Sequence, residues 1–164
     1  MVVDQCDFNT NTATAQGGAI LLMAGQVDIT KGTFIANIAY WGGAVATNYT
    51  GAHLSLAVQS NTLFMENSGT NGGALYISPD TALYLVSDST FSNNDATYSG
   101  GGAYLLSTGL FQRVTFTSNS AVTGAGVYAQ DASGVSCLER QLFPCECLLT
   151  SDCSPLPLYS TDRV

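Results

Sequence analysis

The chain has 164 residues, of which 46% are hydrophobic and 10% charged, so it holds enough apolar material for one folded domain. Twelve acidic residues against four basic ones give a formal net charge of −8, which argues against nucleic acid or anionic lipid as a partner. No stretch approaches the roughly 20 apolar residues that a membrane helix needs, so we expect no direct membrane insertion by this segment.

A repeat occurs five times along the sequence. In each copy a Phe is followed three residues later by Asn and then by a glycine-rich tripeptide, which reads Gly-Gly-Ala in four copies. In chain order the copies are Phe8 and Asn11 with Gly17-Gly18-Ala19, Phe34 and Asn37 with Gly42-Gly43-Ala44, Phe64 and Asn67 with Gly72-Gly73-Ala74, Phe91 and Asn94 with Gly101-Gly102-Ala103, and Phe116 and Asn119 with Gly124-Ala125-Gly126. The phenylalanines lie 26, 30, 27 and 25 residues apart, a period typical of stacked repeats.

Each repeat divides into three short strand-like runs separated by turn residues. The first run follows the glycines, the second alternates with period two, as in 27–29, 54–56 and 83–85, and the third leads into the Phe. Period-two alternation is typical of strands with one buried face. In the first run we place inward the more apolar positions, which are Ile20, Val45, Leu75, Tyr104 and Val127, with Leu22, Ile77 and Leu106 two residues on.

Strands this short cannot pair as hairpins and keep the same order five times, so we expect repeat to stack on repeat. Parallel sheets then run along the stack, and equivalent residues lie directly above one another. The five phenylalanines are expected to form an internal aromatic stack, and the five asparagines a hydrogen-bonded ladder at a corner. Glycine pairs permit the tight bend that a β-carbon would obstruct. The fold prediction is an all-β, single-stranded parallel β-helix, a solenoid of about five coils.

The paired Phe-x-x-Asn and Gly-Gly-Ala-(Ile/Leu/Val) motifs between residue 8 and about residue 130 resemble a known family. They are similar to the repeats of the chlamydial polymorphic outer-membrane proteins and of related right-handed parallel β-helix surface proteins. The resemblance implies a right-handed solenoid over residues 1–135. It also implies a passenger-type segment that acts as an adhesin on a cell surface, with a host or neighbouring-cell surface protein or a glycan as partner.

The five cysteines are Cys6 and a late group of four. The late group, which consists of Cys137, Cys145, Cys147 and Cys153, has neither paired Cys-x-x-Cys spacing nor a neighbouring His. Disulfides are therefore expected, with a metal or reduced thiols as alternatives. Residues 136–164 would form a Cys-rich cap or begin a disulfide-rich module, and Cys6 would be buried in the first coil or linked to an upstream segment. These features favour an extracellular or cell-surface location, held at an outer membrane or cell wall through segments outside this sequence.

Parallel β-helices also host polysaccharide lyases and hydrolases, which need clustered carboxylates. Four polar residues each precede a repeat Phe by three positions and should form one external column: Lys31, Asn61, Asp88 and Arg113. Asp88 and Arg113 would then meet on adjacent coils as a surface ion pair. The sole histidine, His53, has no recognisable nucleophile as a partner, and no two acidic residues share a column on adjacent coils. We therefore expect no catalytic residue, cofactor or metal.

Three aromatic residues lie between the Asn and the glycines of their repeats: Tyr40, Trp41 and Tyr98. Outward rings at this bend are either ordinary exposed aromatics or possible ligand contacts that stack on sugars. The function predicted from the sequence is a non-catalytic extracellular or cell-surface segment that acts as a scaffold or adhesin. The alternative is a polysaccharide-active lyase or hydrolase with the same fold.

Overall fold

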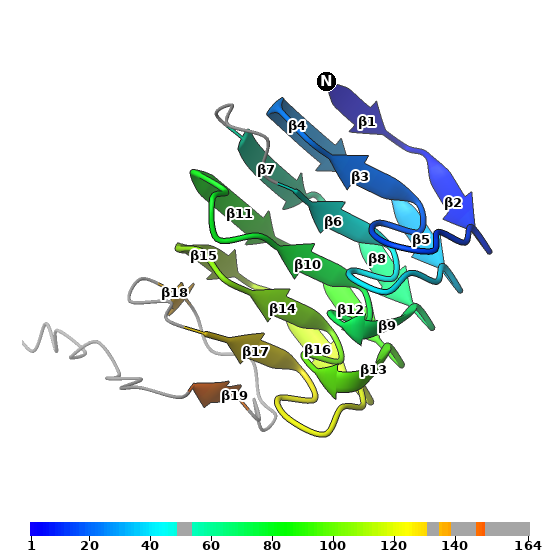
Figure 1. The fold of residues 1–164 in the computed structure, drawn as a ribbon. Helices are drawn as coiled ribbons and strands as arrows, with labels where there is room; N and C mark the ends of the chain where they lie inside the picture. The colour runs from blue at the N-terminus through cyan, green and yellow to red at the C-terminus, as the bar shows by residue number, and fades with distance from the viewer. Residues whose placement is uncertain (49–53, 131–134, 139–146, 150–164) are drawn as a thin grey trace, which may run out of the picture.

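The computed structural model describes residues 1–48, 54–130, 135–138 and 147–149, with side chains up to residue 130. Every regular element in this part of the chain is a β-strand, and every strand pairing is parallel. Successive coils lie one above the other, and each of the first five contributes one strand to each of three sheets (Figure 1). The predicted all-β parallel solenoid of about five coils is confirmed.

The three sheets run along the whole stack. The first sheet contains β1 (Val2–Asp4), β4 (Gly25–Thr30), β7 (Leu54–Gln59), β11 (Leu83–Ser87), β15 (Gly109–Gln112) and β18 (Val135–Leu138). The second contains β3 (Ile20–Leu22), β6 (Val45–Thr47), β10 (Leu75–Ile77), β14 (Ala103–Leu105), β17 (Val127–Ala129) and β19 (Cys147–Leu149). The third contains β2 (Asp7–Asn9), β5 (Thr33–Ile35), β8 (Leu63–Met65), β12 (Thr90–Ser92) and β16 (Thr115–Thr117).

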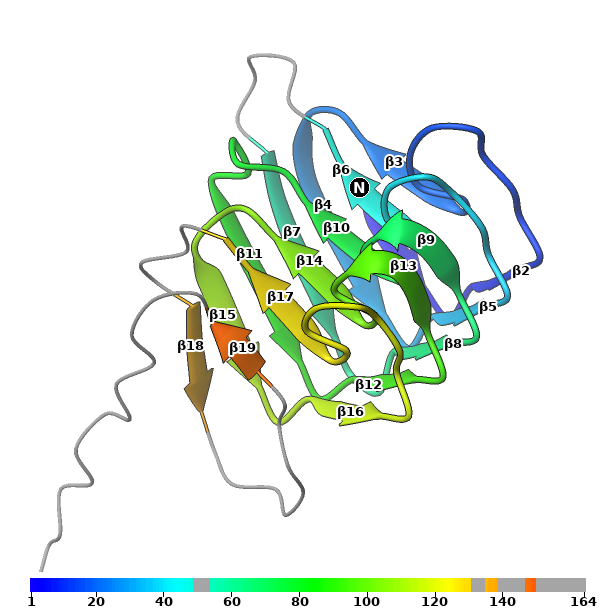
Figure 2. The same ribbon diagram turned by 60° about the horizontal axis from the view of Figure 1, so that its bottom comes forward.

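A shorter pairing closes the corner between the third and second sheets. There β9 (Ser68–Asn71) lies beside β13 (Asp95–Ser99), and isolated bridges continue the same pairing into the coils above and below. In Figure 2 the second sheet crosses the centre of the view, the third sheet lies along its lower edge, and β9 and β13 lie at the corner between them. This corner carries the candidate site described below.

The repeat motif fills the interior of the solenoid. The five phenylalanine rings stack in one column, with neighbouring ring centroids 4.8, 4.8, 4.5 and 4.9 Å apart. Phe34, Phe64 and Phe91 are completely buried. Parallel strands in register repeat at about 4.8 Å, so the ring spacing follows directly from the strand spacing. Aromatic stacking adds roughly 0.5–1.5 kcal/mol per pair to the free energy gained from area burial alone.

The asparagines form a continuous ladder beside this stack. The side-chain oxygen of Asn67 accepts hydrogen bonds from the backbone N–H and the Nδ2 of Asn37, both at 3.0 Å. Its own Nδ2 donates to the carbonyl oxygen of Phe34 and to Oδ1 of Asn94. The same pattern runs from Asn11 at one end to Asn119 at the other. Each side-chain amide therefore holds its coil to the neighbouring coils.

Three columns of residues with positive φ make the bends. One column precedes the strands of the third sheet and one follows them, so each of these strands is enclosed by left-handed residues: Gln5, Lys31, Asn61, Asp88 and Arg113 before, and Thr10, Ala36, Glu66, Asn93 and Ser118 after. The third column is the first glycine of each tripeptide, with φ from +58° to +69°. The first two columns accept ordinary side chains, whereas a β-carbon on a glycine of the third column would lie 2.2–2.5 Å from the carbonyl oxygen three residues on, which explains the glycine.

The fourth glycine tripeptide begins one residue earlier than predicted, at Gly100 and not at Gly101. Gly100 has φ +68°, and its carbonyl accepts from the N–H of Gly73, so Gly102 takes the place of the Ala of other copies. Tyr104 therefore pairs with Tyr76 and both point outward, whereas Leu105 is buried. The inward assignment of Tyr104 and Leu106 is wrong. The other positions assigned inward have the expected orientation.

Strand β11 (Leu83–Ser87) was also predicted with the wrong residues inward. Its first residue points outward, unlike the first residue of the predicted runs 27–29 and 54–56. Leu83 is 60% exposed, whereas Tyr84 is fully buried and lies in register with the inward Leu56. The large ring fits because Gly109 lies beside it in the next coil, where a β-carbon would come within 2.5 Å of the ring. Glycine in one coil thus compensates for tyrosine in the previous coil.

The solenoid pairing continues beyond residue 135. Strand β18 adds to the first sheet with Phe111 opposite Cys137, and β19 adds to the second with Val127 opposite Cys147. Cys145 and Cys153 lie outside the described residues, and the side chains of Cys137 and Cys147 also lie outside, so the disulfides and the 135/136 domain boundary stay predictions. Cys6 is exposed rather than buried, and its thiol donates to the carbonyl oxygen of Asp4 at 3.3 Å.

Candidate functional site

One outward column at the β9/β13 corner carries exposed apolar side chains. The register at this corner places Gln16, Trp41, Asn71, Ser99 and Thr123 above one another. The residues immediately before them form the parallel column, which we call the corner column: Ala15, Tyr40, Thr70, Tyr98 and Val122. Tyr40 is 50% exposed, Tyr98 61% and Val122 81%. The structure thus brings two of the three aromatics singled out in the sequence, Tyr40 and Tyr98, into one line.

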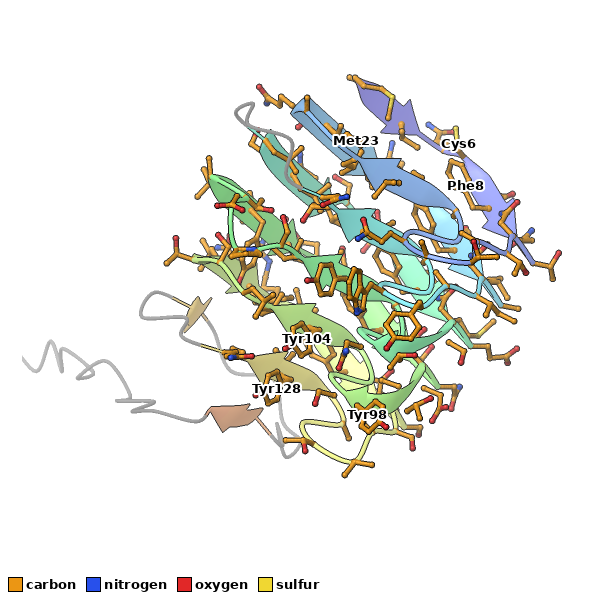
Figure 3. All side chains as sticks on the ribbon, in the orientation of Figure 1. Cys6, Phe8, Met23, Tyr98, Tyr104 and Tyr128 are labelled. Carbon is orange, nitrogen blue, oxygen red and sulfur yellow. The ribbon has the colours of Figure 1, made fainter. Side chains whose placement is uncertain are left out.

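Trp41, the third of those aromatics, belongs to a different surface feature. Its ring stacks on Tyr76 with centroids 5.7 Å apart, and the stack continues through Tyr104 and Tyr128 on the outer face of the second sheet. Figure 3 shows Tyr104 and Tyr128 one above the other, with Tyr98 to one side on β13. We call Trp41, Tyr76, Tyr104 and Tyr128 the outer aromatic ladder. The three tyrosines were not predicted to form an outward column, although each follows its glycine tripeptide at a similar distance.

The outer aromatic ladder is packed face to face, so its rings are not free platforms for a ligand. Burial raises the pKa of the Tyr76 hydroxyl, and burial together with the neighbouring Tyr128 and Tyr76 raises that of Tyr104. The Tyr104 hydroxyl donates to Oε1 of Gln130 at 3.0 Å. The outer aromatic ladder contacts the corner column through an edge-to-face pair between Trp41 and Tyr40, whose ring centroids lie 5.4 Å apart. The ladder therefore supports Tyr40 from behind.

The polar column before the third sheet contains the expected ion pair. Nε and Nη2 of Arg113 donate to the two carboxylate oxygens of Asp88 at 2.5 and 2.6 Å. The hydrogen bond from Arg113 is the largest cause that lowers the pKa of the Asp88 carboxyl. A carboxylate held this way is a poor general base, because protonation must first break the bidentate pair. Asp88 therefore stabilises neighbouring coils and does not resemble a catalytic group.

Groups of three or more His, Cys, Asp or Glu side chains that could hold a metal do not occur among the described residues. His53 lies outside the described residues. The same part of the chain contains no helix that is long and apolar enough to span a bilayer.

Comparison with known proteins agrees with the repeat analysis. Residues 5–22 match the Chlamydia polymorphic membrane protein repeat, a segment that contains Phe8, Asn11 and the first glycine tripeptide. Together with the β-solenoid, this match shows that the chain carries polymorphic membrane protein-like repeats.

The chain also resembles part of one larger protein. The chain is 31% identical over 105 residues to the metabotropic glutamate receptor-like protein R of Dictyostelium discoideum. The matched region is 63% of this chain but 6% of that protein, so the chain spans a small part of the relative's length. No solved structure matches this chain.

Proposed function

We propose that the chain is a non-catalytic segment of a larger surface-exposed protein, in which the solenoid is a rigid scaffold that presents outward side chains for adhesion. The main observation behind the proposal is that the inward residues of each coil repeat, whereas its outward residues differ. The repeated Phe and Asn residues fill the interior stack and ladder, whereas the outward corner column changes from coil to coil. Such an arrangement keeps the scaffold constant while the presented surface varies.

The comparisons support the surface location. The matched repeat is that of a Chlamydia membrane protein, and the relative is named as receptor-like. The exposed side chains of Tyr40, Tyr98 and Val122 support adhesion, because they lie on an outward corner where they can contact a partner. The partner is a surface protein or a glycan of a host or neighbouring cell.

Surface labelling tests the location. Antibodies raised against this chain should label intact cells of the organism that makes the protein, without permeabilisation, and brief protease treatment of intact cells should remove the label. An antibody against a cytosolic protein of the same cells is the control and should label after permeabilisation. Labelling of the chain only after the cells are permeabilised would contradict the proposed location.

A substrate panel tests the non-catalytic assignment. Incubation of the chain with pectins and alginates should release neither new reducing ends nor unsaturated products. A known lyase and a known hydrolase serve as positive controls. Reproducible turnover that the Asp88→Asn variant abolishes would replace the scaffold proposal with a polysaccharide-active enzyme.

A further inference from the structure

The corner column has the spacing and the chemistry of a binding line for a sugar polymer. We infer that it binds a neutral linear polysaccharide that lies along the solenoid axis, an inference that rests on the proposed surface function. Tyr40 and Tyr98 lie two coils apart with Thr70 between them. At about 4.8 Å per coil the backbone positions of the two tyrosines are separated by about 10 Å along the solenoid axis. A linear chain can reach both without bending.

The two tyrosines are suited to sugar rings. Each sugar ring has an apolar C–H face and a rim of hydroxyl groups, and a tyrosine offers an apolar ring with a hydroxyl at its end. Tyr40 is half exposed and its ring is held from behind by Trp41 at 5.4 Å. Since the ladder behind Trp41 is itself stacked, Tyr40 loses little freedom on binding.

Polar side chains flank the corner column on both sides. One flanking column contains Gln16, Trp41, Asn71, Ser99 and Thr123, and the next column but one on the other side contains Thr12, Ile38, Ser68, Asp95 and Ser120. All of these residues except Trp41 and Ile38 are polar. Hydroxyl and amide groups of this kind both donate and accept hydrogen bonds, which matches the hydroxyl rim of a sugar. The corner therefore combines apolar contact with hydrogen-bonding capacity along the same line.

The charge distribution favours a neutral polymer over an acidic one. The cationic side chains among the described residues are Lys31 and Arg113, and both lie in the bend column before the third sheet. The corner itself contains the exposed carboxylate of Asp95, and the whole chain carries a formal net charge of −8. A polyanion would meet repulsion at this surface and find no cation to pair with.

The width of the column favours a polysaccharide over a protein. A stable protein interface buries about 800 Å² on each partner and has a broad apolar centre. The corner column has large apolar neighbours in the coil of Tyr40, where Ile38 is 49% exposed and Trp41 contacts the tyrosine ring, but its flanking residues in the other coils are polar. A single extended polymer covers such a line, whereas a folded protein would leave most of its interface on polar side chains.

Affinity electrophoresis of the whole chain in gels that contain one soluble polysaccharide tests the inference. Neutral β-glucan, xylan and mannan are the probes, and alginate and polygalacturonate are the acidic counterparts. At least one neutral polymer should retard the chain, the acidic polymers should not, and 0.5 M salt should leave the retardation unchanged because no ion pair is involved. Retardation by acidic polymers alone, or by none, would overturn the inference.

Substitutions of the two tyrosines test whether the polysaccharide binds at the corner column. Tyr40→Ser and Tyr98→Ser should each weaken binding about tenfold, and the double variant should abolish it. Leu83→Ser is the matched control, because Leu83 is 60% exposed but lies on the first sheet. Circular dichroism checks that each variant keeps its fold. Binding that survives the double variant would place the site elsewhere and overturn the inference.

Surface labelling of intact cells without polysaccharide binding would overturn the inference alone, whereas absent labelling would overturn the proposed function.

Discussion

At the scale of single residues, the ladder asparagines differ in burial and in the number of hydrogen bonds that their side chains make. Asn67 is fully buried, and its amide makes four hydrogen bonds to Asn37, Asn94 and the carbonyl of Phe34. Asn11 lies at the end of the ladder, is exposed, and uses its side chain for one bond to Asn37. The same residue type in the same motif therefore contributes unequally along the stack.

We predict that Asn67→Ala lowers the free energy of unfolding by about 3–5 kcal/mol, because it leaves several buried donors and acceptors without partners. The matched Asn11→Ala should cost about 1 kcal/mol, the value of one exposed hydrogen bond. Urea unfolding of both variants against the parent chain measures the difference. Equal costs at the two positions would contradict a role for burial in the ladder.

The Asp88 and Arg113 pair predicts a pH dependence. Arg113 holds the folded-state pKa of the Asp88 carboxyl below its ordinary value. The pair therefore stabilises the fold fully above the unfolded-state pKa, and this stabilisation disappears as the pH falls through the lower folded-state pKa. Asp88→Asn, which keeps a side chain that tolerates the positive φ, should lower the stability at pH 7 and match the parent at the most acidic pH that preserves the fold. A constant difference across the pH range would show that the charge is not responsible.

At the scale of the elements, the second glycine of the first four tripeptides sets how closely two coils approach. A β-carbon on Gly43 would lie 2.1 Å from the carbonyl oxygen of Gly73 and 2.4 Å from that of Ser68, both backbone atoms of the next coil. Gly25 in β4 has φ +83° and open space around its missing β-carbon. The two glycines are thus needed for different reasons, contact in one case and backbone conformation in the other.

Gly43→Ala should therefore destabilise the solenoid by about 3 kcal/mol or more, since the backbones of two coils must separate. Gly25→Ala should cost about 1–2 kcal/mol, the conformational penalty of a left-handed residue. Thermal unfolding followed by circular dichroism compares them. A larger loss for Gly25→Ala would mean that close packing at the corner is not the limiting factor.

The strands and their stacking could be predicted from the motif spacing, because residues such as Phe34 and Asn37 recur in fixed order in every coil. Which side chains of each strand point inward was harder to predict. The run from Gly100 to Ala103 has three glycines, and the backbone conformation of Gly100, rather than the best match to Gly-Gly-Ala, decides which residue turns inward. Leu83 faces outward because Tyr84 finds space opposite Gly109, and such a pairing between coils is invisible within a single repeat.

The candidate site was predictable in part for a related reason. The position of Tyr40 and Tyr98 between the Asn and the glycines indicates an outward bend in both repeats. Their alignment depends on a register shift between Ala96 and Ser99 in β13, which absorbs the extra residue of that repeat. A count of residues from the Asn places Thr97, and not Tyr98, above Val122, so the corner column needed the three-dimensional register.

At the scale of the whole molecule, stability should fall from the middle of the stack to its ends. Each inner coil is stacked on both sides, and the inner rings Phe34, Phe64 and Phe91 are fully buried, whereas Phe8 and Phe116 are partly exposed. In a repeat protein each unit gains stability from its two neighbours, so end units open at lower free energy. Amide hydrogen exchange read by mass spectrometry should therefore be slowest in β7, β8 and β10 and faster in β1, β2 and β16. Phe64→Ala, which costs about 3–5 kcal/mol in a buried core, should speed exchange in the coils on both sides, while Phe8→Ala should affect the first coil alone. Uniform protection along the stack would mean instead that the solenoid opens as one cooperative unit, with interfaces between coils that are stronger than the ring and amide contacts account for.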